Sequence, residues 1–436
     1  MRIAFFTDTF VPQINGIATA AANLAEGLGE AGHKVIILVP TQDDMKRKLF
    51  RKKNVKVVYL PSVPVFVYPE IRLEIFGFAQ VFSTLKEFKP DIIHVHTPGT
   101  VGLDALLASY IFKVPIVGTV HTFFTQEEHA QWINNAMLHK AFAGTLTKYY
   151  RTFYESCDYL FCPSKLLLDE LEDERLKSPV YHVPNAITAH PTSKKLSALQ
   201  RKALKKKYHL QEKVIIHFGR LSGEKNVEDV LRTFKLVLEK RPNTSLLVIG
   251  DGPLRGALQK LALSLGIANN VTFTGFIDHS KLLSSRMLEI GDLFVTASVT
   301  ENQPMVVLEA MSFGLPIIGV KQAGMIEMIK DNGYLLPVGD TKAMANKMLA
   351  ILNDTKLHDT LSKHACDSAK QYDVAHVVDR TVEYYNTFTK QGKRAQVFPL
   401  YDKQVAMLRY NSEKIERMFN DLKSSIINTY NEMIGK

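Results

Sequence analysis

Short apolar runs alternate with segments of helical spacing through the first half of the chain, and the same alternation starts again in the second half. Such runs are typical of strands that are buried on both faces of a parallel sheet. Strands alternating with helices predict an α/β fold with a doubly wound, Rossmann-like sheet in each half. The runs are RIAFFTD, KVIILVP, DIIHVHT, VPIVGTVHT, YLFCPS and YHVPNAI, then KVIIHFGRL, SLLVIGDGP, NVTFTGFI, DLFVTAS and LPIIGV.

The domain organisation follows from chain length and from this repeated pattern. The 436 residues exceed what one compact core ordinarily holds, so two domains are expected. We place the first at residues 1–190 and the second at 191–370, facing each other across a cleft. Residues 371–394 are expected to be a helix that crosses back to the first domain, and 395–436 a helical extension. An apolar stripe on that extension indicates packing on its own chain or in a homodimer, with membrane contact as the alternative.

Composition indicates a soluble globular enzyme, with 46% hydrophobic and 22% charged residues. No uncharged apolar stretch of about 18 residues occurs, so no transmembrane helix is expected. The beginning of the chain lacks the apolar core and cleavage site of a signal peptide. The three cysteines Cys157, Cys162 and Cys366 are therefore predicted to be reduced thiols in a cytosolic protein, with structural roles.

The net charge of +10 favours acidic partners such as nucleic acid, an anionic membrane or phosphate-bearing small molecules. The charge is concentrated in Met45–Lys56 and Ser193–Leu210, each of which could also be a solvated loop or helix face. The first block contains apolar residues, and the apolar-aromatic segment Pro61–Phe78 follows it, a combination typical of interfacial anchors. The residues predicted to touch a membrane are Lys46, Arg47, Lys48, Leu49, Phe50, Arg51, Lys52 and Lys53.

Two cations and several glycines follow predicted strands, at the sheet edge where ligands bind in open parallel sheets. Arg220 and Lys225 lie in a strand-end loop before a helix, a place suited to a diphosphate, although they could also be solvated surface cations. Gly16 precedes a helix of small residues and would let a phosphate approach the backbone. The GDGP segment at 250–253 is a weak phosphate-loop signal that could equally be a tight turn.

Two glutamates flank a predicted helix start in the segment TENQPMVVLEA. Glu301 lies in the loop and Glu309 lies more than one turn into the helix, and each carboxylate could accept hydrogen bonds from a vicinal diol. The alternative for Glu309 is a pair with a core cation. Unpaired backbone amides at the helix start could bind sugar hydroxyls or phosphate oxygens. They belong to the neighbourhood of Asn302, Gln303, Pro304 and Met305.

Histidines follow two strands of the first domain. His121 lies on the side expected to face the cleft, where a functional and a structural role are equally supported. His94 and His96 share one face of a strand, but no third ligand stands out, so structural roles are favoured over a metal site. No Asp-x-Asp sequence occurs, and a carboxylate-bound divalent metal is therefore not expected.

In combination these motifs resemble the retaining GT-B glycosyltransferases with the Glu-x7-Glu signature, over roughly residues 1–390. FFTDTFVPQINGIAT, PDIIHVHTPGTVGL and GTVHTFFTQ are similar to bacterial diacylglycerol glucosyltransferases. The resemblance implies that the first domain binds the acceptor and the second a nucleotide sugar. The catalytic residues it implies are Glu301, His121, Arg220 and Lys225. The donor-binding residues it implies are Gly16, Arg220, Lys225, Ile277, Glu301, Asn302, Gln303, Pro304, Met305 and Glu309.

The resemblance further implies hexosyl, especially glucosyl, transfer from a UDP-sugar to diacylglycerol, as in 1,2-diacylglycerol 3-glucosyltransferases. The enzyme would be peripheral on the cytoplasmic face of a bacterial membrane and would need no metal or tightly bound cofactor. Soluble, protein or teichoic-acid acceptors remain alternatives. A nucleic-acid-binding role is less favoured, because no recognition-helix pattern and no aromatic-basic pattern of an RNA module occur.

Overall fold

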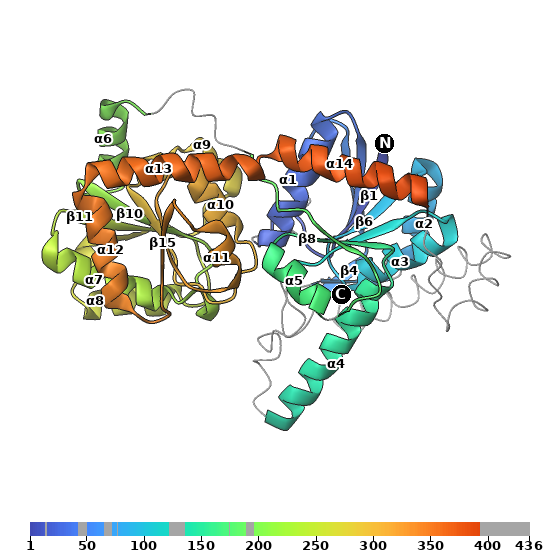
Figure 1. Cartoon of the computed structure of the whole chain (residues 1–436), viewed down its shortest axis with the longest axis horizontal. Helices are drawn as coiled ribbons and strands as arrows, with labels where there is room; N and C mark the ends of the chain where they lie inside the picture. Colours follow the sequence, from blue (N-terminus) through green and yellow to red (C-terminus); the bar gives the residue numbers. More distant parts are fainter. Residues whose placement is uncertain are drawn as a thin grey trace, which may run out of the picture.

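The computed structural model describes residues 1–13, 15–41, 50–64, 72–75, 77–121, 136–173, 175–188 and 196–392. It contains two α/β domains that lie side by side, as Figure 1 shows. The predicted architecture of two doubly wound parallel sheets is confirmed. The extension 395–436, and with it the expected homodimer contact, lies outside the described residues.

The first domain has a seven-stranded parallel sheet in the order β3-β2-β1-β6-β7-β8-β9. Two apolar layers bury its faces: α1 and α14 cover one, and α2, α3, α4 and α5 contribute to the other. The strands are β1 (Arg2–Phe6), β2 (Lys34–Pro40), β3 (Val55–Leu60), β6 (Ile92–Val95), β7 (Ile116–Thr119), β8 (Tyr159–Cys162) and β9 (Val180–His182). The helices are α1 (Gly16–Glu30), α2 (Phe78–Phe88), α3 (Thr100–Phe112), α4 (Ala136–Glu155), α5 (Lys165–Asp173) and α14 (Val374–Gln391).

The second domain has a six-stranded parallel sheet in the order β12-β11-β10-β13-β14-β15. Helices α7, α8 and α12 cover one face, and α9, α10, α11 and α13 contribute to the other. The strands are β10 (Lys213–Phe218), β11 (Thr244–Ile249), β12 (Val271–Phe273), β13 (Leu293–Val295), β14 (Ile317–Val320) and β15 (Gly333–Leu336). The helices are α6 (Ala198–Lys207), α7 (Val227–Lys240), α8 (Arg255–Ser264), α9 (His279–Ser284), α10 (Met305–Ser312), α11 (Ala323–Met328), α12 (Thr341–Asn353) and α13 (Thr355–Ala369).

Helix α14 returns from the second domain and packs on the first (Figure 1). At the crossing, Ile187 donates its N–H to Tyr372 O at 2.9 Å and accepts from Val374 N at 2.8 Å. Farther along the helix Tyr385 is fully buried, and the Phe388 ring stacks on Tyr159 at 3.8 Å between centroids. The two segments of the chain that pass between the domains therefore lie side by side. Residues late in the sequence complete the core of the first domain.

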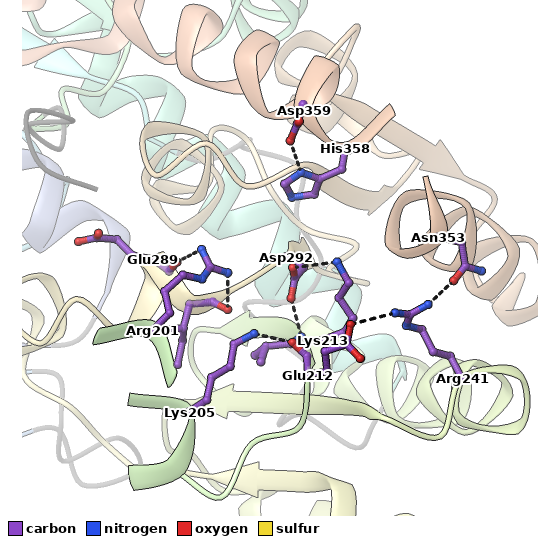
Figure 2. A network of polar contacts seen from close by, with 12 residues as sticks. Arg201, Lys205, Glu212, Lys213, Arg241, Glu289, Asp292, Asn353, His358 and Asp359 are labelled. Atoms are coloured by element: carbon purple, nitrogen blue, oxygen red, sulfur yellow. Dashed lines mark hydrogen bonds and ion pairs between the residues drawn. The ribbon is translucent and has the colours of Figure 1, made fainter. Parts of the chain in front are cut away.

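The second basic block is partly a structural anchor at the amino ends of the second sheet's strands. Figure 2 shows Arg201 of α6 reaching the carbonyl of Glu289, at 2.8 Å from Nη1. Nearby, Lys213 Nζ lies 3.4 Å from Asp292 Oδ1, and Arg241 lies 3.6 Å from Glu212. These contacts lie at the opposite edge of the sheet from the strand ends that carry the predicted site.

Three structural elements were not anticipated from the sequence. Strands β3 and β15 lie at sheet edges, where part of each strand remains accessible and the apolar pattern is weak. The third is an antiparallel pair of β4 (Ser62–Pro64) and β5 (Arg72–Glu74), so part of the segment expected to touch a membrane folds into the domain. Among the helices that the structure describes, none is long and apolar enough to cross a membrane.

Candidate active site at the domain seam

The predicted cation pair follows β10, in a loop at the carboxyl end of the sheet. Arg220 is exposed, and Lys225 ends a short 3-10 turn that begins at Gly223. The Lys225 ammonium donates to Glu301 Oε1 at 2.5 Å, although the two residues come from different strand-end loops. The structure therefore brings together two of the predicted catalytic residues, whose catalytic roles remain predictions.

Glu301 lies within the loop that joins β13 to α10. Ser298 Oγ donates to the same Oε1 atom at 2.9 Å, and only 14% of the Glu301 side chain is exposed. Helix α10 begins at Met305 with Pro304 as its N-cap; the Val307 N–H donates to Pro304 O at 3.1 Å, whereas the Met305 and Val306 amides precede any intrahelical acceptor. Glu309 lies inside this helix with 6% of its surface exposed. Carboxylates and backbone donors thus gather around one helix start.

The GDGP segment supports the Arg220 loop through close backbone contact. A Cβ on Gly250 would lie 1.9 Å from Gly219 O, and one on Gly252 would lie 2.4 Å from Leu221 O. Leu221 also donates its N–H to Asp251 O at 2.9 Å. Glycine is required here because the two loops touch through their main chains. The structure therefore supports the tight-turn interpretation of this segment.

The loop between Glu301 and α10 reaches the first domain through two amide side chains. Asn302 Nδ2 donates to His121 O at 3.1 Å, and its Oδ1 accepts a short hydrogen bond from Ser164 Oγ. Gln303 Oε1 accepts from Asn185 N at 2.6 Å. These residues were predicted to act through backbone amides near the donor, whereas their side chains join the two domains.

A second contact lies beside this one, where α5 meets α11. Glu327 accepts from Lys165 N at 2.8 Å and lies 3.7 Å from His182 Nε2. We call these two groups of contacts the domain seam: residues 121, 164–165 and 182–185 of the first domain with residues 301–305 and 324–327 of the second. The seam joins the carboxyl edges of both sheets, where ligands bind in open α/β folds.

Gly16 begins α1 and faces the start of α10. A Cβ on Gly16 would lie 3.8 Å from Met305 Cγ, so the N-termini of the two helices approach each other across the seam. Asn15 caps α1 by accepting from Ala18 N at 2.8 Å. One amide of this helix start is therefore occupied by the protein itself.

Three histidines lie at the carboxyl edge of the first sheet. His94 is fully buried, with Nδ1 2.5 Å from Tyr385 Oη and Nε2 2.6 Å from Thr119 Oγ1. Both of its nitrogens are thus used by protein oxygens, which supports the expected structural role. His96 is 2% exposed and lies next to His121, with 3.4 Å between Nδ1 and Nε2. Burial lowers the pKa of His121 to about 4, so this ring is neutral at physiological pH.

The remaining predicted residues differ in how much the structure describes. Ile277 follows β12 and packs, half-buried, against the apolar core beneath α10. Of the predicted membrane contacts, Lys46, Arg47, Lys48 and Leu49 lie outside the described residues. The Phe50 ring packs at 5.1 Å from that of Phe10, and Lys52 pairs with Glu26. Arg51 and Lys53 are exposed. These cations could therefore contact a membrane surface, whereas the Phe50 ring is packed against the protein.

Two supporting residues were missed by sequence reasoning. Gly324 touches the Glu301–Asn302 backbone so closely that a Cβ would lie 1.4 Å from Asn302 O. Asp8 follows β1 and caps α3, accepting from Gly99 N and Val101 N at 3.0 Å each. The close approach of Gly324 had no local signal, because its partner is 22 positions away in the sequence. The role of Asp8 had no local signal either, because it caps a helix that begins more than 90 positions later in the sequence.

Among the described residues, no group of three or more His, Cys, Asp or Glu side chains is arranged to hold a metal ion. Charged side chains that meet at or beside the seam include the Lys225–Glu301 pair and Glu327, which lies 3.7 Å from His182 Nε2.

Known protein families match both halves of the chain. The model described as Glycosyltransferase Family 4 matches residues 14–190, and the one described as Glycosyl transferases group 1 matches residues 200–367. An alpha-monoglucosyldiacylglycerol synthase of Streptococcus pneumoniae is 31% identical over 338 residues, which cover 77% of this chain and 74% of that protein. The enzyme of the same name from Acholeplasma laidlawii is 27% identical and matches 85% of this chain and 93% of that protein.

Solved structures show the same arrangement of two domains. HepE of Anabaena, crystallised with UDP, superposes with a TM-score of 0.68 at 21% identity. The match covers 89% of this chain and the whole of that one. At this identity the likeness concerns the fold.

Proposed function

The chain belongs to the GT-B glycosyltransferases, and from that premise we propose that it transfers a glucosyl unit from a UDP-sugar to diacylglycerol with retention of the anomeric configuration. The observation that carries the proposal is the Lys225–Glu301 pair, 2.5 Å apart beside the start of α10. Through Asn302 this group is joined to His121 of the first domain. Cation, carboxylate, helix start and histidine thus converge from separate strand ends.

The donor would lie along the carboxyl edge of the second sheet. Arg220, Lys225 and the first-turn amides of α10 would hold the diphosphate, because these groups stabilise an anion without a metal. Glu309 would accept hydrogen bonds from the ribose hydroxyls, and the backbone near Ile277 would contact the base. Glu301 would bind the hexose, which places the anomeric carbon next to the first domain.

Transfer would need little covalent chemistry from the protein. The acceptor hydroxyl oxygen forms the new bond to the anomeric carbon while the bond from that carbon to the diphosphate oxygen breaks. The acceptor attacks from the face that the diphosphate leaves, which gives retention, and the hydroxyl proton passes to a diphosphate oxygen on that same face. Lys225 and Arg220 would stabilise the charge of the leaving UDP, and the seam would hold donor and acceptor in the reacting geometry.

The acceptor and the location are proposed from charge and from relatives. Two relatives are named for the synthesis of a glucosyldiacylglycerol. The chain carries a net charge of +10, and Arg51 and Lys53 are exposed on the first domain. Cations of this kind bind anionic lipid headgroups, so we place the enzyme as a peripheral protein on the cytoplasmic face of a bacterial membrane.

A transfer assay with two variables tests the proposal. The purified full chain is incubated with UDP-glucose, UDP-galactose, UDP-N-acetylglucosamine or GDP-mannose, in anionic vesicles with or without diacylglycerol. We expect a glucosylated lipid only with UDP-glucose and diacylglycerol, without added metal and in the presence of EDTA. Transfer to a soluble or polymeric acceptor in the absence of diacylglycerol would contradict the proposed acceptor.

Vesicle sedimentation tests the proposed location separately. We expect the protein to sediment with anionic vesicles at low salt and to be released as salt screens the cations. Neutral vesicles are the matched control and should bind less. A protein that stays in the supernatant with anionic vesicles at low salt would contradict the peripheral location.

A further inference from the structure

One edge of the His121 ring is engaged by His96, a buried histidine that the proposed transfer does not use. His96 Nδ1 lies 3.4 Å from His121 Nε2. His96 Nε2 is buried and has no hydrogen-bond partner among the described residues. His94 occupies the same strand but has oxygen partners for both nitrogens. His96 differs from His94 because one of its two ring nitrogens has no partner among the described residues, and the other contacts only His121.

The two rings meet edge to edge along a hydrogen-bonding direction. Their centroids are 5.7 Å apart and their planes differ by 25°. In a five-membered ring with bonds of about 1.35 Å, each atom lies about 1.15 Å from the centre. Twice that distance accounts for the difference between the centroid separation and the 3.4 Å between the nitrogens. His96 Nδ1 and His121 Nε2 thus lie on the line that joins the ring centres, where an N–H of one ring points at the lone pair of the other.

Each ring is neutral and carries one proton at physiological pH, because burial lowers the pKa of both histidines. Two arrangements are then available. If His121 Nε2 donates, His96 must carry its proton on Nε2, and a buried N–H is left without an acceptor. If His96 Nδ1 donates, only a lone pair is left without a partner. Orphaned buried N–H groups are rare in folded proteins, so the second arrangement is favoured.

We propose that His96 is a positioning residue that donates from Nδ1 to His121 and thereby holds the His121 proton on Nδ1. His121 would then offer a fixed N–H donor to the hexose or to the acceptor oxygen. The main chain of His121 is also fixed, because its carbonyl accepts from Asn302 at 3.1 Å. The His121 ring is thus held by a residue of the first domain, and the His121 backbone is held by a residue of the second. The catalytic part of this inference rests on the proposed function, whereas the tautomer does not.

The tautomer can be measured without any activity. The chain has 14 histidines, so the protein is labelled with ¹⁵N and ¹³C in histidine, and the His121 signals are assigned by their absence from His121→Gln. We expect the wild-type His121 ring to be neutral and protonated on Nδ1. In His96→Leu, which removes the donor, we expect the ring to populate both tautomers. A wild-type His121 protonated on Nε2, or unchanged signals in His96→Leu, would overturn the proposal.

Two variants connect the tautomer to turnover. His96→Leu keeps the apolar volume, and His96→Asn keeps an N–H near the position of Nδ1. We expect kcat to fall about 10- to 100-fold in His96→Leu, by analogy with residues that orient a ligating or reacting group. We expect the KM for the UDP-sugar to change less than about threefold, and His96→Asn to retain kcat within about threefold.

Thermal unfolding separates positioning from a structural role. His96→Leu removes a buried nitrogen that has no partner together with the donor to His121; the two effects on stability oppose each other, so Tm is expected to change by only a few degrees. A loss of Tm that parallels the loss of kcat in both variants would overturn the positioning role. If no donor is turned over by the wild type, the proposed function fails, and the labelled-histidine spectra still decide the tautomer.

Discussion

Around the proposed site, the second domain places charged side chains at the seam, whereas the first domain places neutral histidines there. Lys225 and Glu301 lie 2.5 Å apart in the second domain, with Arg220 in the same loop. In the first domain, burial lowers the pKa of His96 and His121 and keeps both rings uncharged. Under the proposed function this difference follows the chemistry: the diphosphate needs fixed charge, and the hexose and lipid hydroxyls need neutral hydrogen-bonding groups.

The largest effect is expected from removing the cation. Lys225→Ala should lower transfer at least about 100-fold, because it deletes a group that stabilises the charge of the leaving diphosphate. The measurement is kcat with UDP-glucose and diacylglycerol vesicles. Lys235→Ala, an exposed lysine on α7, is the matched control and should leave kcat unchanged. Full activity in Lys225→Ala would contradict the proposed role of the second domain's charges in stabilising the diphosphate.

A smaller but still large effect is expected where the charged loop is supported. Gly324→Ala would place a Cβ 1.4 Å from Asn302 O, which must displace the loop that carries Glu301. Kinetic assays should show a loss of about 10- to 100-fold in kcat/KM, since misplaced groups lose rate steeply. Gly256→Ala in α8 is the control, because no atom lies within 4 Å of its Cβ position. Equal kinetics in the two variants would show that the loop tolerates displacement.

An intermediate effect is expected from uncoupling the two domains. Asn302→Ala removes the contacts to His121 O and Ser164 Oγ. Two neutral hydrogen bonds contribute roughly 1–3 kcal/mol, so the KM for the UDP-sugar should rise about tenfold. Asn270→Ala removes contacts to Pro242 O and Thr244 O far from the seam, and its KM should be unchanged. An unchanged KM in Asn302→Ala would contradict the view that contacts between the domains position the donor site.

The smallest effect concerns Asp104 of α3 in the first domain, whose neutral form is favoured by burial. Burial raises the pKa of Asp104 from its ordinary value of 3.8, and the neighbouring Glu74 raises it further. A raised carboxyl pKa contributes stability at low pH that is lost as pH rises above 3.8. Asp104→Asn keeps a hydrogen-bond donor without the charge, so its Tm gain over the wild type should be near zero at about pH 4 and a few degrees at pH 8. The comparison is made by thermal scans across pH, and a Tm difference that shrinks as pH rises would contradict the neutral state of this carboxyl.

Sequence reasoning predicted the elements that local pattern determines. The runs ending at Phe6 and Phe218 are apolar on both faces, so their place in the middle of each sheet could be predicted. Strand β3 (Val55–Leu60) was missed because its residues are mostly half-exposed at the sheet edge. Periodicity measures burial, and an edge strand is only partly buried.

The same limit applies to the site. The motifs predicted that Lys225 and Glu301 belong to one site, because parallel strand ends meet at one edge. The bonds from Asn302 to His121 and from Gln303 to Asn185 could not be predicted, since they depend on how the domains dock. His96 was assigned a structural role from sequence, and only the geometry of its ring relative to His121 points to a further one.

The return of α14 means that the first domain is discontinuous in sequence. A fragment ending at 188 lacks the partners that bury Tyr159 and Phe161, because Tyr385 and Phe388 come from the far end of the described chain. Such a fragment synthesised alone would expose an aromatic surface and aggregate. The first domain therefore cannot be completed until α14 has been synthesised, and a gene split after residue 188 should work only when the second piece carries α14.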